Sequence, residues 1–389
     1  MVRSDEGAQE GRRAGNAKPS PAATGQPMSV VIPLDPSDFP CRGSRVLAHA
    51  GPMRAEAFRY EGGTEALRLV TPRADVVILP YLGQQIWRAA FDGRELAMSS
   101  MFDAPVATDR YLATYGAFFL HCGITRIGPP SPEDPHPLHG ELPLGRFEAA
   151  HLVIDPIAGR IGLRGRFRHR IAFSVNYEAE AEVMLGAQDT FLDVTLDVTN
   201  RRAGAPLELM YLGHANFRPV DHGRLVYAAR YTPQDVAVRR SIPPHVRPGP
   251  GLERFLDDLA RDPAGHHLLD PALPFDPEVV FTIRMIPDET GWTHAMQVHP
   301  GGHADFISHE TSSLPLAIRW VCRTGDQQGL GIALPSTAGV EGHAVEAAAG
   351  RIVIVPPEGL WRARMRMGAL DPTAAAALEA RIDRLAGRG

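Results

Sequence analysis

The chain has 389 residues, of which 44% are hydrophobic and 22% are charged, and its formal net charge at pH 7 is −5. Length and composition are typical of a globular protein that buries a large core. The slightly acidic balance gives no basic field for nucleic acid or an anionic membrane surface, so we expect neither partner.

The ends of the chain and its cysteines bear on its location. Residues 1–27 are small, polar and rich in Pro and Gly, with no apolar segment typical of a signal peptide, which predicts a disordered leader. No run of about eighteen apolar residues occurs, so we expect no membrane span. The three cysteines, Cys41, Cys122 and Cys322, are odd in number and far apart. They argue against a disulfide framework and favour a reducing, cytoplasmic location.

Short strand-like runs dominate the chain from about Leu67 onward, among them ADVVILP, TFLDVTLDVTN and GRIVIVPP. Many alternate with period two and are bounded by Gly, Pro or Asp, as strands are. In the clearest run we expect an inward set and an outward set: Phe191, Val194, Leu196 and Val198 against Asp193, Thr195, Asp197 and Thr199. So many strands without intervening helices predict an all-β fold, one large antiparallel β-sandwich domain over residues 28–371.

Three stretches depart from the strand pattern. Residues 101–118 and 252–268 are compatible with short helices. The sequence PTAAAALEARIDRLAG predicts an Ala-rich amphipathic helix that begins at Pro372, so residues 372–389 are expected to form a C-terminal helix and tail.

Four segments, in order, carry a resemblance to a known family. They are VVILPYLGQQIWRAAFDGREL (76–96), HPLHGELPLGRFE (136–148), LELMYLGHANFRPV (207–220) and the closing strands from GLGIALP to MRMGAL (329–370). Together the segments resemble the galactose mutarotase (aldose 1-epimerase) superfamily, in a less characterised mutarotase-like branch. The resemblance implies a galactose mutarotase-like supersandwich that interconverts sugar anomers.

The resemblance also implies catalytic roles. Ring opening needs a base for the anomeric hydroxyl and an acid for the ring oxygen, and histidine suits either role. By resemblance, His214 is the acid, His139 a hydrogen-bond partner of a sugar oxygen, and a carboxylate the base. The family's Glu has no counterpart after the strand that ends at 332–337. The nearest carboxylate, Glu341, is the candidate. No cofactor and no metal are implied.

Further residues are candidates for binding the sugar. Asn216 lies two positions after His214 and would share its face of a strand. His121 and Arg126, in FLHCGITRIG, could contact a hydroxyl or an anionic group of the sugar. Trp320 could stack on a pyranose face. For each residue a structural role is the competing interpretation, since lone histidines and tryptophans are often core residues.

Three functions fit these residues, all with a small sugar as partner. The first is a mutarotase that needs His214, His139 and a carboxylate. The second is an isomerase or epimerase acting at carbon, which would use His121, His139 and His214 and could recruit a metal. The third is a carbohydrate-binding protein without catalysis, because fold does not fix function. A homodimer is compatible with each of them.

Overall fold

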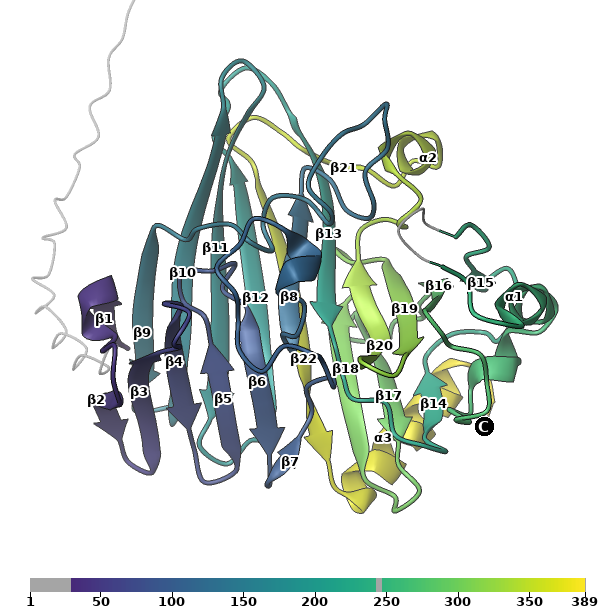
Figure 1. Ribbon diagram of the computed structural model, residues 1–389, viewed down its shortest axis with the longest axis horizontal. Coiled ribbons are helices and arrows are strands. Elements are labelled where there is room, and N and C mark those ends of the chain that lie inside the picture. The colour runs from purple at the N-terminus through teal and green to yellow at the C-terminus, as the bar shows by residue number, and fades with distance from the viewer. Residues whose placement is uncertain (1–28, 243–246, 389) are drawn as a thin grey trace, which may run out of the picture.

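The computed structural model describes residues 29–242 and 247–388, which form two large antiparallel sheets packed face to face (Figure 1). The predicted all-β antiparallel sandwich is thereby confirmed. The predicted leader, residues 1–27, lies outside the described residues. Among the described helices, none is long and apolar enough to cross a membrane.

One sheet has nine strands. Their order is β1 (Val30–Leu34), β9 (Ala149–Asp155), β10 (Arg160–Ile171), β11 (Val175–Gly186), β12 (Phe191–Asn200), β22 (Leu360–Leu370), β18 (Ala304–Glu310), β17 (Trp292–Val298) and β14 (Arg224–Tyr227).

The other sheet has thirteen strands. Eleven lie in the order β15 (Val236–Val238), β16 (Val279–Arg284), β19 (Leu316–Arg323), β20 (Gln328–Ser336), β13 (Leu207–Ala215), β8 (Phe119–Ile124), β6 (Ile86–Phe91), β5 (Ala74–Ile78), β4 (Glu65–Val70), β3 (Met53–Arg59) and β2 (Ser44–Ala50). Two short strands lie off this path: β7 (Arg94–Glu95) pairs with β6, and β21 (Val353–Val355) pairs with β13.

Helices are few and lie at the margins of the sheets. The α-helices are α1 (Leu252–Arg261), α2 (His343–Ala348) and α3 (Pro372–Leu385), and the 3₁₀ helices are η1 (Pro36–Asp38), η2 (Tyr111–Ala113) and η3 (Pro263–His266). The terminal helix begins at Pro372 as predicted, and the Asp371 carboxylate caps it by accepting from the Ala374 N–H. Within 101–118 only the 3₁₀ turn η2 forms. Within 252–268 the expected helix is present as α1, followed by η3.

Strand β12 shows how period-two alternation builds the core. Val194, Leu196 and Val198 are fully buried between the sheets, while Asp193, Thr195 and Asp197 are only partly buried on the opposite face. The prediction that Phe191 points inward is wrong: Leu192 is buried in the core instead, and Phe191 shares the outer face of the sheet with Asp193. An odd-numbered residue cannot join the even-numbered face of a regular strand.

The interior between the sheets also contains a histidine. On β8 and β13, His121 and Tyr211 face the nine-stranded sheet, where Tyr211 packs on Trp361 of β22. The ring nitrogen Nδ1 of His121 lies 2.8 Å from the Tyr211 hydroxyl. The side chain is fully buried, and this burial lowers the pKa of His121 from 6.5 to about 3.

Buried neutral His121 makes stability depend on pH. Between pH 6.5 and about 3, the unfolded chain binds a proton at this residue and the folded chain does not, so the free energy of unfolding falls as pH falls. We expect His121→Leu to reduce the slope of that free energy against pH by about 1.4 kcal/mol per pH unit. Urea denaturation between pH 6.5 and 4.5 measures the slope. An unchanged slope would mean that His121 is already protonated in the folded protein.

Candidate active site

A pocket of about 290 Å³ lies on the face of the thirteen-stranded sheet that points away from the other sheet. The pocket lies on this face because successive side chains of β13 point to opposite faces of the sheet. Tyr211 faces inward against Trp361, so Leu212 and His214 point outward, and both line the pocket. The floor is completed by side chains from β16, β19 and β20, and the walls come from loops.

His214 is held by Asn216, the residue that shares its face of the chain. The Nδ2 group of Asn216 donates to the Ala117 carbonyl (2.9 Å), which leaves Oδ1 to accept from the Tyr115 hydroxyl (3.2 Å) and from Nδ1 of His214 (2.8 Å). Nδ1 therefore carries the ring proton of neutral His214, and Nε2 is the acceptor. Burial, only partly offset by the bond to Asn216, lowers the pKa of His214 to about 4, so the ring is neutral at pH 7.

His139 reaches the same pocket from a loop. A turn closed by the Gly140 N–H and the Pro137 carbonyl (2.8 Å) places both His139 (φ 61°) and Gly140 (φ 84°) in the left-handed region. A side chain at Gly140 would collide with the carbonyl oxygens of Arg126 and Gly123, so glycine lets the loop press onto β8. The His139 backbone is then fixed on both sides: its N–H donates to the Gly128 carbonyl, and its carbonyl accepts from the Gly123 N–H.

The ring polarity of His139 is opposite to that of His214. The Gly128 N–H donates to Nδ1 of His139 (3.4 Å), so in the neutral ring Nε2 carries the proton. The centroids of the two imidazole rings are 5.4 Å apart, and the ring planes are nearly perpendicular. The pocket thus presents an Nε2 acceptor on His214 beside an Nε2–H donor on His139.

Aromatic side chains surround the histidine pair. Trp320 lies 5.6 Å from His214 and 5.9 Å from Tyr115 between ring centroids, and Tyr111 lies 5.1 Å from His139. Tyr111 and Tyr115 both come from the 101–118 stretch, whose contribution to the site the sequence reasoning missed. Two tyrosines within five residues, before an apolar strand, were the available signal.

The carboxylates of this pocket are Glu278 and Asp326. Glu278 directly precedes β16, and one of its oxygens accepts from Nε1 of Trp320 at 2.8 Å. Sequence reasoning missed both residues. In the sequence, Glu278 stands between Pro277 and the strand VVFTIR. Nothing there indicates that the start of this strand lies in the same pocket as His214.

Comparisons with known proteins agree with this architecture. No protein-family profile and no curated protein matches the sequence. Among solved structures, a proposed aldose 1-epimerase from Klebsiella pneumoniae matches with a TM-score of 0.76 and 17% identity, over 92% of this chain and 96% of that one. The chain has the galactose mutarotase-like fold.

Two further solved structures share the galactose mutarotase-like fold at lower similarity. A galactose mutarotase-like protein from Clostridium acetobutylicum has a TM-score of 0.56 and 12% identity, over 82% of this chain and 98% of that one. A galactose 1-epimerase from Lactobacillus acidophilus has a TM-score of 0.50 and 12% identity, over 84% and 98%. The architecture implied by the four sequence segments is confirmed.

Three of the predicted site residues lie away from the lining of the pocket. His121 points to the inter-sheet core, on the opposite face of the sheet from His214. The Arg126 guanidinium is paired with Asp134 at 2.8 Å. Glu341 is partly exposed beside the pocket, where it accepts from Arg239 (3.1 Å) and from the Ser241 hydroxyl (3.1 Å). The structure therefore brings together His139, His214 and Trp320, with Asn216 buried behind His214.

No group of three or more His, Cys, Asp or Glu side chains that could hold a metal ion occurs within residues 29–242 and 247–388.

The Asn216 amide is expected to determine the tautomer of His214. Asn216→Ala removes three hydrogen bonds at a fully buried position, so it should lower the free energy of unfolding by about 1–3 kcal/mol. Long-range ¹H–¹⁵N correlation spectra should show His214 protonated at Nδ1 in the wild type and a tautomer mixture in the variant. Asn176→Ala, which removes an exposed hydrogen bond to the Arg201 carbonyl, is the matched control and should change stability by less than about 0.5 kcal/mol. A wild-type His214 protonated at Nε2 would contradict the assignment.

Proposed function

We propose that the pocket binds a sugar and that the chain interconverts its anomers by acid–base ring opening. One observation carries the proposal: His214 and His139 present an acceptor and a donor side by side, 5.4 Å apart between ring centroids, in one pocket. Anomer interconversion needs these two functions on neighbouring oxygens of a pyranose, the anomeric hydroxyl and the ring oxygen.

The reaction is divided between the two rings. Nε2 of His214 takes the proton of the anomeric hydroxyl as the ring C–O bond breaks. The ring oxygen accepts a hydrogen bond from Nε2–H of His139 and takes the proton in turn from the His214 imidazolium. The open-chain carbonyl rotates about its C1–C2 bond. Closure returns the protons in reverse, so no atom is gained or lost. The Asn216 Oδ1 supports His214 as base, because it stabilises the positive ring that proton uptake creates.

This assignment differs from the roles that the sequence resemblance implied, in which His214 is the acid and not the base. The reason is the direction of the hydrogen bonds. Nδ1 of His214 donates to the Asn216 oxygen, so Nε2 of the neutral ring is the acceptor. The lowered pKa of His214 keeps the ring neutral. In His139, Nδ1 accepts from the Gly128 N–H, so Nε2 of the neutral ring carries the proton and donates.

The rest of the pocket supports sugar recognition. Trp320, Tyr111 and Tyr115 offer apolar faces that suit the C–H bonds of a pyranose. Glu278, held by the Trp320 N–H, and Asp326 are acceptors for sugar hydroxyls. A volume of about 290 Å³ is near the lower end of ordinary small-ligand sites and suits a single sugar ring.

Proton NMR of anomer exchange tests the reaction. With a panel of aldoses, ketoses and uronic acids, wild-type protein should speed interconversion of at least one sugar, with and without chelator. His214→Ala and His139→Ala should each slow it by about 10²-fold or more. His343→Ala is the matched control, because that histidine pairs with Glu208 outside the pocket, and it should retain the full rate.

The other outcomes are equally informative. A full rate in His214→Ala would remove His214 from the mechanism. New sugar resonances would show isomerisation at carbon, and their loss with chelator would make that reaction metal-dependent. Line broadening from binding, without exchange by any sugar of the panel, would identify a carbohydrate-binding protein.

The pH profile tests His214 as the base. Because its pKa is lowered from 6.5 to about 4, His214 stays neutral through mildly acidic conditions. We expect kcat/KM, corrected for spontaneous exchange, to be level from pH 7 to about 5 and to fall as pH approaches 4. A fall centred near pH 6.5 would contradict the role of a buried neutral imidazole.

Glu278→Gln separates the two groups that could act as base. The substitution keeps an oxygen that accepts from Trp320 but removes the charge. We expect KM to rise and kcat to change by less than about tenfold, since Glu278 binds a hydroxyl in this scheme. A loss of kcat as large as that of His214→Ala would assign the base to Glu278 instead.

A further inference from the structure

A second cavity, of about 480 Å³, lies on the outer face of the nine-stranded sheet, beneath helix α3. Ala375 and Ile382 anchor the helix by packing against an apolar cluster on β14, β17 and β18. Arg381 of the helix, with Ala374 and Leu378, borders the cavity. This cavity is distinct from the candidate active site, which lies on the outer face of the other sheet and shares no lining residue with it.

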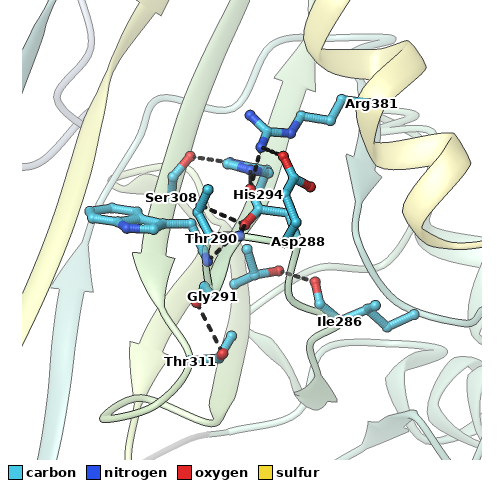
Figure 2. Close-up of polar contacts among 11 residues, drawn as sticks. Ile286, Asp288, Thr290, Gly291, His294, Ser308, Thr311 and Arg381 are labelled. Atoms are coloured by element: carbon cyan, nitrogen blue, oxygen red, sulfur yellow. Dashed lines mark hydrogen bonds and ion pairs between the residues drawn. The ribbon is translucent and has the colours of Figure 1, made fainter.

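Within the cavity, Ser308, His294 and Asp288 form a hydrogen-bonded chain (Figure 2). Oγ of Ser308 on β18 lies 2.8 Å from Nδ1 of His294 on β17, and Nε2 of His294 lies 2.9 Å from Oδ2 of Asp288. Ser308 and His294 are directly opposite each other in the register of the two strands. Serine, imidazole and carboxylate follow the order of a nucleophile, a general base and an orienting group, with the two ring nitrogens exchanged relative to the usual serine triad.

Asp288 is held firmly as a carboxylate. Oδ1 accepts from the Thr290 N–H (2.8 Å), the Thr290 hydroxyl (2.7 Å) and the Trp292 N–H (3.1 Å), and Oδ2 also accepts from Arg381 (2.6 Å). Burial raises the pKa of Asp288, but these hydrogen bonds and the one from His294 bring it well below its usual value. The side chain is therefore ionised near neutral pH and can only accept.

An ionised Asp288 fixes the polarity of the whole chain. Because Asp288 accepts, Nε2 of His294 must carry a proton, and in the neutral ring Nδ1 is then the acceptor. The Ser308 hydroxyl accordingly donates to Nδ1, the direction needed for a base to activate it. Burial lowers the pKa of His294, which keeps the ring neutral and able to accept that proton.

The cavity is also lined by a cation from the neighbouring strand β22. Arg366 lies opposite Ser308 in the register of β18 and β22 and lines the cavity. Its guanidinium lies 4.2 Å from the centre of the Phe191 ring, and its Nε donates to Asp193 (2.8 Å). These contacts hold the guanidinium toward β12, the neighbour of β22 on the side away from Ser308, so Arg366 contributes charge to the cavity but no contact to the serine.

Apolar side chains form the remaining wall, with Phe306, Leu370 and Leu378 from β18, β22 and α3. A short acyl chain fits such a wall, and its carbonyl would then lie toward Ser308. The ligand class that this combination favours is a small carboxylic ester rather than a sugar, because Phe306, two residues from Ser308 on the same face of β18, makes the wall beside the serine apolar.

We propose that Ser308, His294 and Asp288 form a second reactive site, in which Ser308 is a nucleophile toward short-chain carboxylic esters. Ser308 Oγ attacks the acyl carbon while Nδ1 of His294 takes the hydroxyl proton. The alcohol leaves with that proton, and an acyl–Ser308 ester remains. Water, deprotonated by His294, then cleaves this ester to give the carboxylic acid and free Ser308.

A fluorophosphonate probe tests the nucleophile directly, because it reacts with activated serines and releases fluoride. Intact-mass measurement of the full chain should show one adduct, and peptide mapping should place it on Ser308. His294→Gln should slow labelling by about 10²-fold or more. Hydrolysis of p-nitrophenyl acetate should be reduced by a similar factor in Ser308→Ala.

The controls separate reactivity from folding. Ser313→Ala changes a serine in the turn after the same strand, outside the cavity, and should label like the wild type. Peptide mapping of the wild type does not depend on any variant folding. Wild-type protein that melts cooperatively and carries no adduct on Ser308 would overturn the proposal and leave the three residues as a structural network that fastens α3. The His214→Ala variant should label normally, so failure of the sugar chemistry and failure of this site are distinguishable.

Discussion

The face-to-face packing of two antiparallel sheets is the constraint on which the rest of this structure depends. Burial of one face of each sheet commits every second residue of its strands to the apolar core. Polar chemistry is then left to the outer faces. His214 on β13 and His294 on β17 both lie on such outer positions, and both are covered afterwards, one by loops and the other by helix α3. Where loops or a helix cover part of an outer face, a cavity forms between them and the sheet, and the core between the sheets stays continuous.

Each cavity is lined by a buried histidine with a lowered pKa, but the two histidines are oriented by different partners. Asn216 is an uncharged acceptor that also donates to the Ala117 carbonyl, so its own orientation is fixed. Asp288 is a charged acceptor held by hydrogen bonds from Thr290, Trp292 and Arg381. Burial is the largest cause of the lowered pKa at both histidines, whether the partner is an amide or a carboxylate.

Much of the fold was predictable from the sequence because it rests on local pattern. Strand alternation and the Asp371–Pro372 helix start are properties of neighbouring residues, and both are present in the structure. The site was predictable only where a motif marked it. The His139–Gly140 pair requires left-handed backbone at both positions, which makes a recognisable signal, and His214 ends an apolar strand.

The residues that sequence reasoning missed or misplaced depend on which strand ends meet in space. Glu278 lies sixty-four positions after His214 and reaches the pocket only because β16, β19, β20 and β13 are neighbours in the sheet. Glu341 is closer along the chain to the expected position, yet its carboxylate is engaged by Arg239 and Ser241. Phe191 and His121 show the same limit at the level of a single strand, where an error of one residue in register reverses the face to which a side chain points.

The roles proposed for the histidines rest on hydrogen-bond polarity more than on residue type. The chain has sixteen histidines, and their identity alone does not distinguish a base from a structural residue. His121 and His214 are both buried with lowered pKa values, and each has a polar partner on Nδ1. His121, however, is enclosed between the sheets, whereas the accepting nitrogen of His214 belongs to a ring that lines a cavity. Catalytic use of a histidine therefore requires three conditions at once: a fixed tautomer, a neutral ring at working pH, and a cavity on the side of the remaining nitrogen. His214 combines the three conditions at the candidate active site. His294 also has a fixed tautomer and a lowered pKa, but both of its nitrogens are engaged, so its proposed action is on the hydrogen-bonded Ser308 hydroxyl.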